Sequence, residues 1–143
     1  MAGSAADSNT APRNAWRSTG AVLAGMATVV ALSLLTDQLL HVLAVYPPWG
    51  QPMRAPALNL LALGYRCIYN VVGSYLTAQL APRNPRRHLW VFALIGFALG
   101  AVGAIATIPM DLGPAWYPIL LALSAFPCTW AGWALYRRRR TAA

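Results

Sequence analysis

The chain has 143 residues, of which 58% are hydrophobic and only 10% are charged, and its mean hydropathy is +0.49. This composition excludes an ordinary soluble domain, in which about a quarter of the residues are charged. The formal net charge of +8 does not indicate nucleic-acid binding, because the arginines stand at the ends of apolar runs and form no basic face.

The positions of the arginines predict the architecture. All 11 basic residues are arginine, and nine of them form clusters before the first apolar run, between the second and third, and after the last: Arg13 and Arg17; Arg83, Arg86 and Arg87; Arg137, Arg138, Arg139 and Arg140. The other two connections carry only Arg54. Basic residues mark the cytoplasmic side of membrane proteins, so this pattern predicts four spans with both termini inside.

The predicted fold is therefore an all-α integral membrane bundle of four antiparallel transmembrane helices. Each apolar run is about 20 residues long, which is the length that a helix needs to cross a bilayer. A cleaved signal peptide is not expected, because Asp37 and His41 separate the first run from the nearest small-residue site. In chain order we predict a disordered cytoplasmic tail at 1–15, a four-helix transmembrane domain at 16–136 with spans at about 16–40, 57–81, 88–108 and 116–136, and a basic cytoplasmic tail at 137–143.

Prolines and cysteines add detail to this plan. Three prolines between residues 46 and 52 predict an irregular outer loop, and Pro109 and Pro114 bound a second one. Pro127 predicts a kink in the fourth span, because proline removes a backbone hydrogen bond. Cys67 and Cys128 are expected at different depths as packing thiols, without a disulfide.

Ionisable groups within the spans form a candidate polar cluster. Asp37 and His41 are four residues apart on one face of the first helix, and Arg66 and Asn70 are four apart on the second. At about 1.5 Å per residue, Asp37 and Arg66 both fall in the outer third of the bilayer, which predicts an ion pair. The pair either joins the two helices or belongs to a polar vestibule for a small solute or protons; alternatively Arg66 extends outward unpaired.

Small residues predict how the third helix packs. Gly96, Gly100 and Gly103 recur at helical spacing and include a GxxxG pattern. Such a face lets helix backbones approach closely, either within the bundle or in a homo-oligomer or a complex with a membrane partner subunit.

Several kinds of chemistry lack the residues they need. The chain has no glutamate, no HxxxH, HExxH or CxxC motif and no phosphate-binding glycine loop. We therefore expect no enzymatic activity, no metal and no cofactor.

Several short segments are similar to known proteins. They are TDQLLH at 36–41, YPPWGQPM at 46–53, ALGYR at 62–66, GSYLTA at 73–78, WYP at 116–118 and FPC at 126–128. Together they resemble a group of small four-span bacterial inner-membrane proteins with no known activity. The resemblance implies a multi-pass protein of the bacterial inner membrane and implies no reaction or substrate.

The function expected from the sequence is that of a non-enzymatic structural or accessory subunit in the lipid bilayer. The alternative is a small-solute or proton-linked transport protein whose polar site near the outer face contains Asp37, His41 and Arg66.

Overall fold

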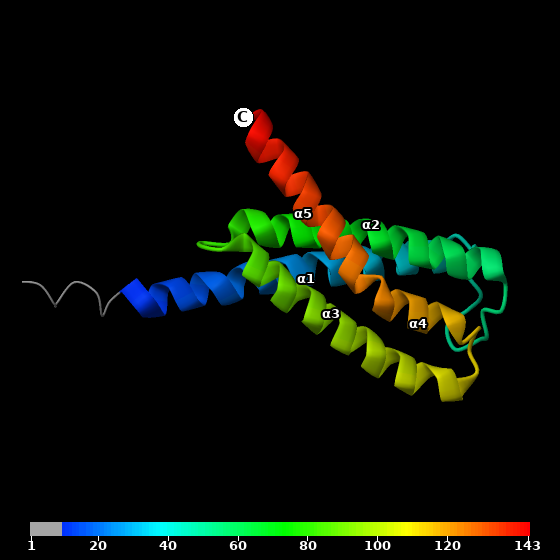
Figure 1. The fold of residues 1–143 in the computed structure, drawn as a ribbon. Coiled ribbons are helices and arrows are strands. Elements are labelled where there is room, and N and C mark those ends of the chain that lie inside the picture. Colours follow the sequence, from blue (N-terminus) through cyan, green and yellow to red (C-terminus); the bar gives the residue numbers. More distant parts are fainter. Residues whose placement is uncertain (1–9) are drawn as a thin grey trace, which may run out of the picture.

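The computed structural model describes residues 10–143, and this part of the chain contains helices and loops but no strand (Figure 1). The all-α prediction is therefore confirmed. In chain order the elements are α1 (Thr10–Val42), α2 (Pro56–Leu80), α3 (Pro85–Thr107), the 3-10 helix η1 (Ile108–Met110), α4 (Trp116–Leu123) and α5 (Ala125–Ala142).

Within residues 10–143, three helical segments are long and apolar enough to cross a membrane: Asn14–Val42, Pro85–Met110 and Trp116–Ala142. In their most apolar windows only 17–28% of the residues are buried, so most of this apolar surface faces outward. The chain is thus a helical membrane protein. The 25-residue α2 is not one of the three, because Asn59, Arg66 and Asn70 lower its hydropathy.

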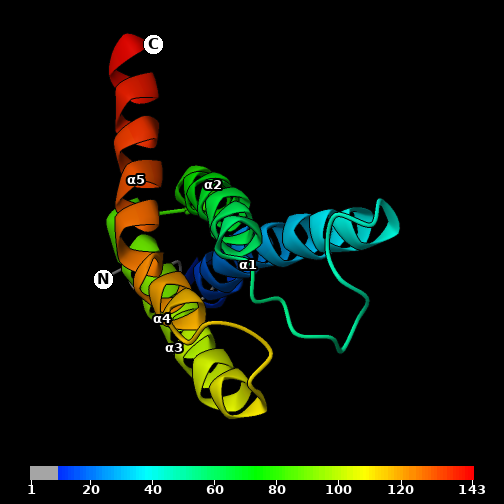
Figure 2. The same ribbon diagram turned by 90° about the vertical axis from the view of Figure 1, so that its right-hand side faces the viewer.

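Helix α2 lies in the middle of the arrangement and packs mainly against α1 and α5 (Figure 2). The connections 43–55 and 108–115 lie at one end of the molecule, here called the loop end (Figure 1). The α2–α3 turn and the described start of α1 lie at the opposite end, here called the arginine end because it carries residues 81–87. Helix α5 rises away from the bundle toward the C-terminus.

Helix boundaries follow the prolines, with two differences from the predicted plan. Proline occupies an initial position of both α2 and α3, where its fixed φ suits a helix start. Residues 10–15 are helical where the sequence predicts a disordered tail, and residues 1–9 lie outside the described part. Helix α5 likewise includes the arginine run and continues to Ala142, because arginine is a good helix former.

The last of these three segments changes direction between α4 and α5, at Ser124 (Figure 2). Pro127 lies three residues further on and cannot donate a backbone hydrogen bond to Leu123. The break therefore falls where Pro127 predicts a kink.

Glycines allow the central helices to cross closely. A Cβ at Gly25 of α1 would lie 2.5 Å from the carbonyl oxygen of Gly73 in α2 and would also meet the side chain of Thr77. On the other face of α2, a Cβ at Gly132 of α5 would collide with the side chain of Ser74. Larger residues at these glycines would therefore force α1 or α5 away from α2.

Two cysteines lie closer together than expected. Cys67 of α2 and Cys128 of α5 are both free thiols, and their side chains are neighbours. The expectation that they lie at different depths is wrong, because α5 crosses α2 obliquely. Counting residues along helices that are inclined to each other therefore gives the wrong relative depth for these two cysteines.

Candidate functional site

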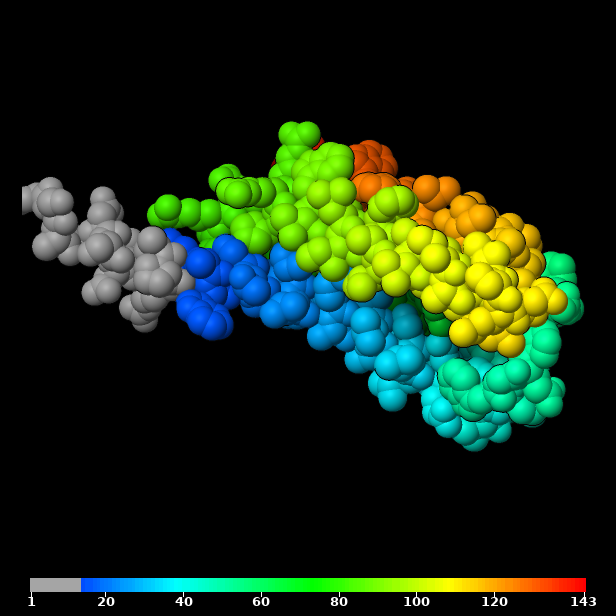
Figure 3. Space-filling model, turned by 90° about the horizontal axis from the view of Figure 1, so that it is seen from below, coloured from blue at the N-terminus to red at the C-terminus, as the bar shows by residue number. Residues whose placement is uncertain are grey.

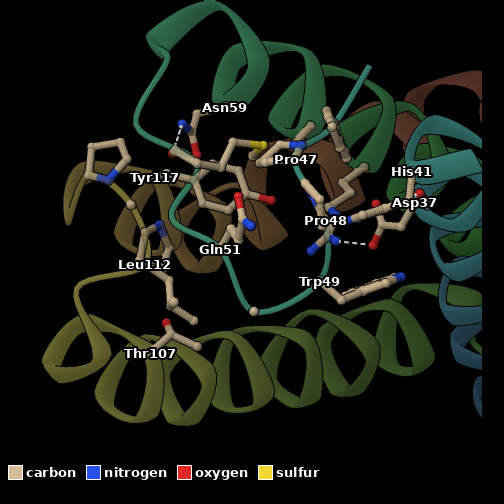
Figure 4. A pocket seen from close by; sticks show the side chains of 18 of the residues that line it. Asp37, His41, Pro47, Pro48, Trp49, Gln51, Asn59, Thr107, Leu112 and Tyr117 are labelled. Atoms are coloured by element: carbon tan, nitrogen blue, oxygen red, sulfur yellow. Dashed lines mark hydrogen bonds and ion pairs between the residues drawn. The ribbon is translucent and has the colours of Figure 1, made fainter. Parts of the chain in front are cut away.

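An ion pair joins α1 to α2 at the loop end (Figure 4). Asp37 is only 7% exposed, and its Oδ2 lies 2.5 Å from Nη2 of Arg66. The hydroxyl of Tyr65 donates a hydrogen bond to Oδ1 of the same carboxylate. Both carboxylate oxygens therefore have donors, as a buried carboxylate requires.

A second contact lies about one helical turn away and fixes the register of the two helices. The hydroxyls of Thr36 and Tyr69 are hydrogen-bonded at 2.7 Å. Tyr65 and Tyr69 are four residues apart, so both lie on the face of α2 that meets α1. The Thr36–Tyr69 bond is therefore a second polar contact between α1 and α2.

His41 lies one helical turn beyond Asp37 on α1. Its Nδ1 lies 2.7 Å from the backbone oxygen of Asp37, and since a carbonyl can only accept, Nδ1 carries the proton. The imidazole stacks on the indole of Trp49, with ring centroids 3.9 Å apart and planes inclined by 4°. His41 therefore closes the end of α1 and holds the following loop.

Tyr46 connects that loop to the ion pair. Because the Tyr65 hydroxyl donates to Asp37, Tyr46 donates to the Tyr65 hydroxyl oxygen, at 3.3 Å. Burial raises the pKa of Tyr46 above its ordinary value, chiefly by removing water from around the phenolate form. Tyr46 therefore stays a neutral donor at physiological pH.

The two connections at the loop end are tied to each other. The guanidinium of Arg54 lies 2.6 Å from the carboxylate of Asp111, and the backbone N–H of Met53 donates to the oxygen of Leu112 at 2.7 Å. The amide nitrogen of Asn59, a side chain buried in α2, donates to the oxygens of Met53 and Ala55. These bonds hold the first connection over the end of the bundle.

Beneath these connections is a cavity of about 330 Å³ (Figure 4). Its walls come from α1, α2, η1, the start of α4 and both connections, and include His41, Trp49, Asn59 and Tyr117. Arg66 also borders it, and Nε of Arg66 is buried without a hydrogen-bond partner in the described residues. The cavity thus combines aromatic walls with the side chain of an arginine that is 29% exposed. Seen from below in Figure 3, the teal connection and the yellow α3–α4 region cover this end together.

The predicted site residues are only partly brought together. Asp37 and Arg66 are paired and His41 lies beside them, whereas the half-buried Asn70 is not among the residues that line the cavity. Sequence reasoning missed Tyr65 and the Arg54–Asp111 pair. The signal for that pair was available, because these are the one basic and the one acidic residue of the two connections.

The three glycines of α3 also differ from one another. A Cβ at Gly100 would lie 2.8 Å from Cα of Ala122 in α4, and one at Gly96 would lie 3.7 Å from Cβ of Ala125. A Cβ at Gly103 would meet nothing within 4 Å in the described chain. Internal packing thus involves Gly100 closely and Gly96 loosely, and it does not involve Gly103.

Within residues 10–143 no group of three or more His, Cys, Asp or Glu side chains could hold a metal ion. No family model, curated protein or solved structure matches the chain. The structure therefore defines a helical membrane protein with a buried, fully partnered carboxylate and a small cavity at one end.

Proposed function

We propose that the chain is a four-span protein of the bacterial inner membrane, with both termini in the cytoplasm. At about 1.5 Å per residue the 25 residues of α2 extend roughly 37 Å, enough to cross a hydrocarbon core of about 30 Å. Arg66 pairs with Asp37 of α1 and Asn59 bonds the first connection, which makes a less apolar span acceptable. The clusters at residues 83–87 and 137–140 give the arginine end the positive charge typical of the cytoplasmic side.

Its proposed role is that of a non-enzymatic structural or accessory subunit. The observation that carries this proposal is that Tyr65 and Arg66 together bond both oxygens of Asp37. The cluster therefore holds α1 and α2 together. Deeper in the bundle, Ser74 and Thr77 are 0% exposed, and their hydroxyls bond the backbone of their own helix. These two hydroxyls therefore have partners within α2.

A screen for solute binding tests this proposal. The melting temperature of the purified full chain is measured in detergent with small anions, amino acids and sugars. If the chain is an accessory subunit, none of these solutes should change it. A ligand at a hundred times its dissociation constant would add about 2.7 kcal/mol of stability, so binding would be visible. The Trp49→Ala variant removes a side chain that lines the cavity. Trp16→Ala is the matched control, because Trp16 is exposed and does not line the cavity.

The second candidate function is binding of a small solute at the loop end, as part of transport. The partly exposed side chain of Arg66 at the wall of a cavity of about 330 Å³ favours it, because small-molecule sites combine apolar walls with a few placed polar groups. A solute that stabilises wild type and Trp16→Ala, but not Trp49→Ala, would establish this function and contradict the purely structural one.

A further inference from the structure

A second hollow lies at the arginine end, between α3 and α5. It has a volume of about 580 Å³. The rings of Phe97 and Phe126, 5.3 Å apart, bring the two helices into contact deeper in the bundle. Toward the arginine end α5 turns away from α3 (Figure 1). Side chains of both helices line a groove there.

Both walls of the groove present the same order of side chains. On α3, Arg86 is followed one turn deeper by Trp90. On α5, Arg137 is preceded one turn deeper by Trp133, with Trp130 beyond it. Spacings of three and four put these residues on one face of each helix, so arginines line the mouth and indoles the interior.

The two arginines are available to a ligand. Neither α3 nor α5 contains an acidic residue, and neither Arg86 nor Arg137 is in an ion pair within the described chain. By contrast, the guanidiniums of Arg139 and Arg140 lie over the rings of Tyr75 and Tyr136. The mouth of the groove therefore carries two positive charges without a counterion among residues 10–143.

We propose that this groove binds an anionic phospholipid of the cytoplasmic leaflet. Arginine forms paired hydrogen bonds with phosphate, tryptophan suits the depth of the lipid carbonyls, and the apolar interior accepts an acyl chain. Basic pockets between transmembrane helices on the cytoplasmic side have the chemistry that anionic headgroups need. A free phosphate would leave the tryptophan-lined interior unused. The proposal rests on the proposed orientation, which puts the arginine end in the cytoplasm.

The test compares lipids that differ only in headgroup. The purified full chain in detergent is titrated with dioleoyl phosphatidylglycerol or dioleoyl phosphatidylcholine, and retained lipid is counted by native mass spectrometry. Wild type should retain the anionic lipid preferentially. Arg86→Gln with Arg137→Gln should reduce that preference roughly thirtyfold, which is the effect of losing two arginines beside an anionic headgroup. The control, Arg87→Gln with Arg138→Gln, removes equal charge outside the groove and should change it less than twofold.

Fluorescence of the wild-type protein gives a second measurement that needs no variant. Phosphatidylglycerol brominated on its acyl chains should quench tryptophan, and unlabelled phosphatidylglycerol, but not phosphatidylcholine, should reverse the quenching. Equal retention of both lipids by wild type, or equal losses in the two double variants, would overturn the proposal. These measurements are made in detergent and do not depend on orientation. A failed topology test would therefore contradict the proposed function without changing the measured lipid binding.

Discussion

Arg54 and Asp111, 57 residues apart in the chain, form an ion pair of 2.6 Å that joins the two connections at the loop end. Their side chains are 65% and 74% exposed, so solvent screens the pair and its stabilising effect is small. Its effect is on the position of the first connection, which covers the cavity.

Breaking this pair should loosen the connection with little effect on the whole fold. We expect Arg54→Gln to lower the free energy of unfolding by less than about 1 kcal/mol. Hydrogen exchange at the Met53 amide, which bonds the Leu112 oxygen, should become faster. The reversed pair Arg54→Asp with Asp111→Arg should restore slow exchange. Unchanged exchange in Arg54→Gln would mean that the pair does not position the connection.

Packing of α3 on α4 gives a comparison between two glycines of one helix. We expect Gly100→Leu to destabilise the protein by roughly 1–3 kcal/mol, because its Cβ would press on the backbone of Ala122. Gly103→Leu is the matched control and should leave the melting temperature in detergent unchanged, since its Cβ meets no described atom within 4 Å. Equal effects would show that helix propensity, and not the contact, determines stability.

Tyr46 should make part of the stability pH-dependent. Its pKa is raised above the ordinary 10.0 by burial, so the folded state holds the phenolic proton more tightly than the unfolded chain. This contribution is fully present below pH 10 and is lost as the pH rises above it. Tyr46→Phe removes the titrating group and the bond to Tyr65, so we expect about 1 kcal/mol less stability at neutral pH and a shallower loss in alkali. Parallel curves for the two proteins above pH 10 would contradict this explanation.

The proposed orientation makes a direct prediction for reporter fusions. Alkaline phosphatase is active only outside the cytoplasm, so it should be inactive when fused after Ala143 and active when inserted after Gly50. A fluorescent protein that folds only in the cytoplasm should give the opposite pattern. Activity of phosphatase at the C-terminus would overturn the four-span, termini-inside arrangement.

The sequence predicts the helical class and most helix limits because apolar length, proline and arginine act locally. Pro127 and the break at Ser124 are an example of such a local relationship. The contacts between helices were harder to predict. Asp37 and Arg66 meet because two helices run antiparallel at similar depth, whereas Cys67 and Cys128 meet through an oblique crossing that spacing does not reveal. Tyr65 was missed because a tyrosine next to an arginine has no signature of its own.

The same limit applies to the glycines and to His41. A small-residue pattern identifies a face that permits close approach, but only a neighbouring helix decides which glycine uses it. Gly100 has that neighbour in Ala122 and Gly103 has none within 4 Å in the described chain. His41 shares a helix face with Asp37, yet its ring bonds the backbone and stacks on Trp49 of the following loop. Loop residues that approach from outside the helix are beyond any periodicity argument.

The central claim, that Asp37 and Arg66 form a joint between α1 and α2, is tested most directly by a double-mutant cycle. Asp37→Asn and Arg66→Gln each leave a polar partner unmatched in a poorly solvated place, and each should cost about 3 kcal/mol of unfolding free energy in detergent. The double variant should recover at least about 1 kcal/mol relative to the sum. The exposed pair, changed by Arg54→Gln and Asp111→Asn, is the control and should show much weaker coupling. Additive effects of Asp37→Asn and Arg66→Gln would contradict the account, because they would mean that the two side chains do not stabilise each other.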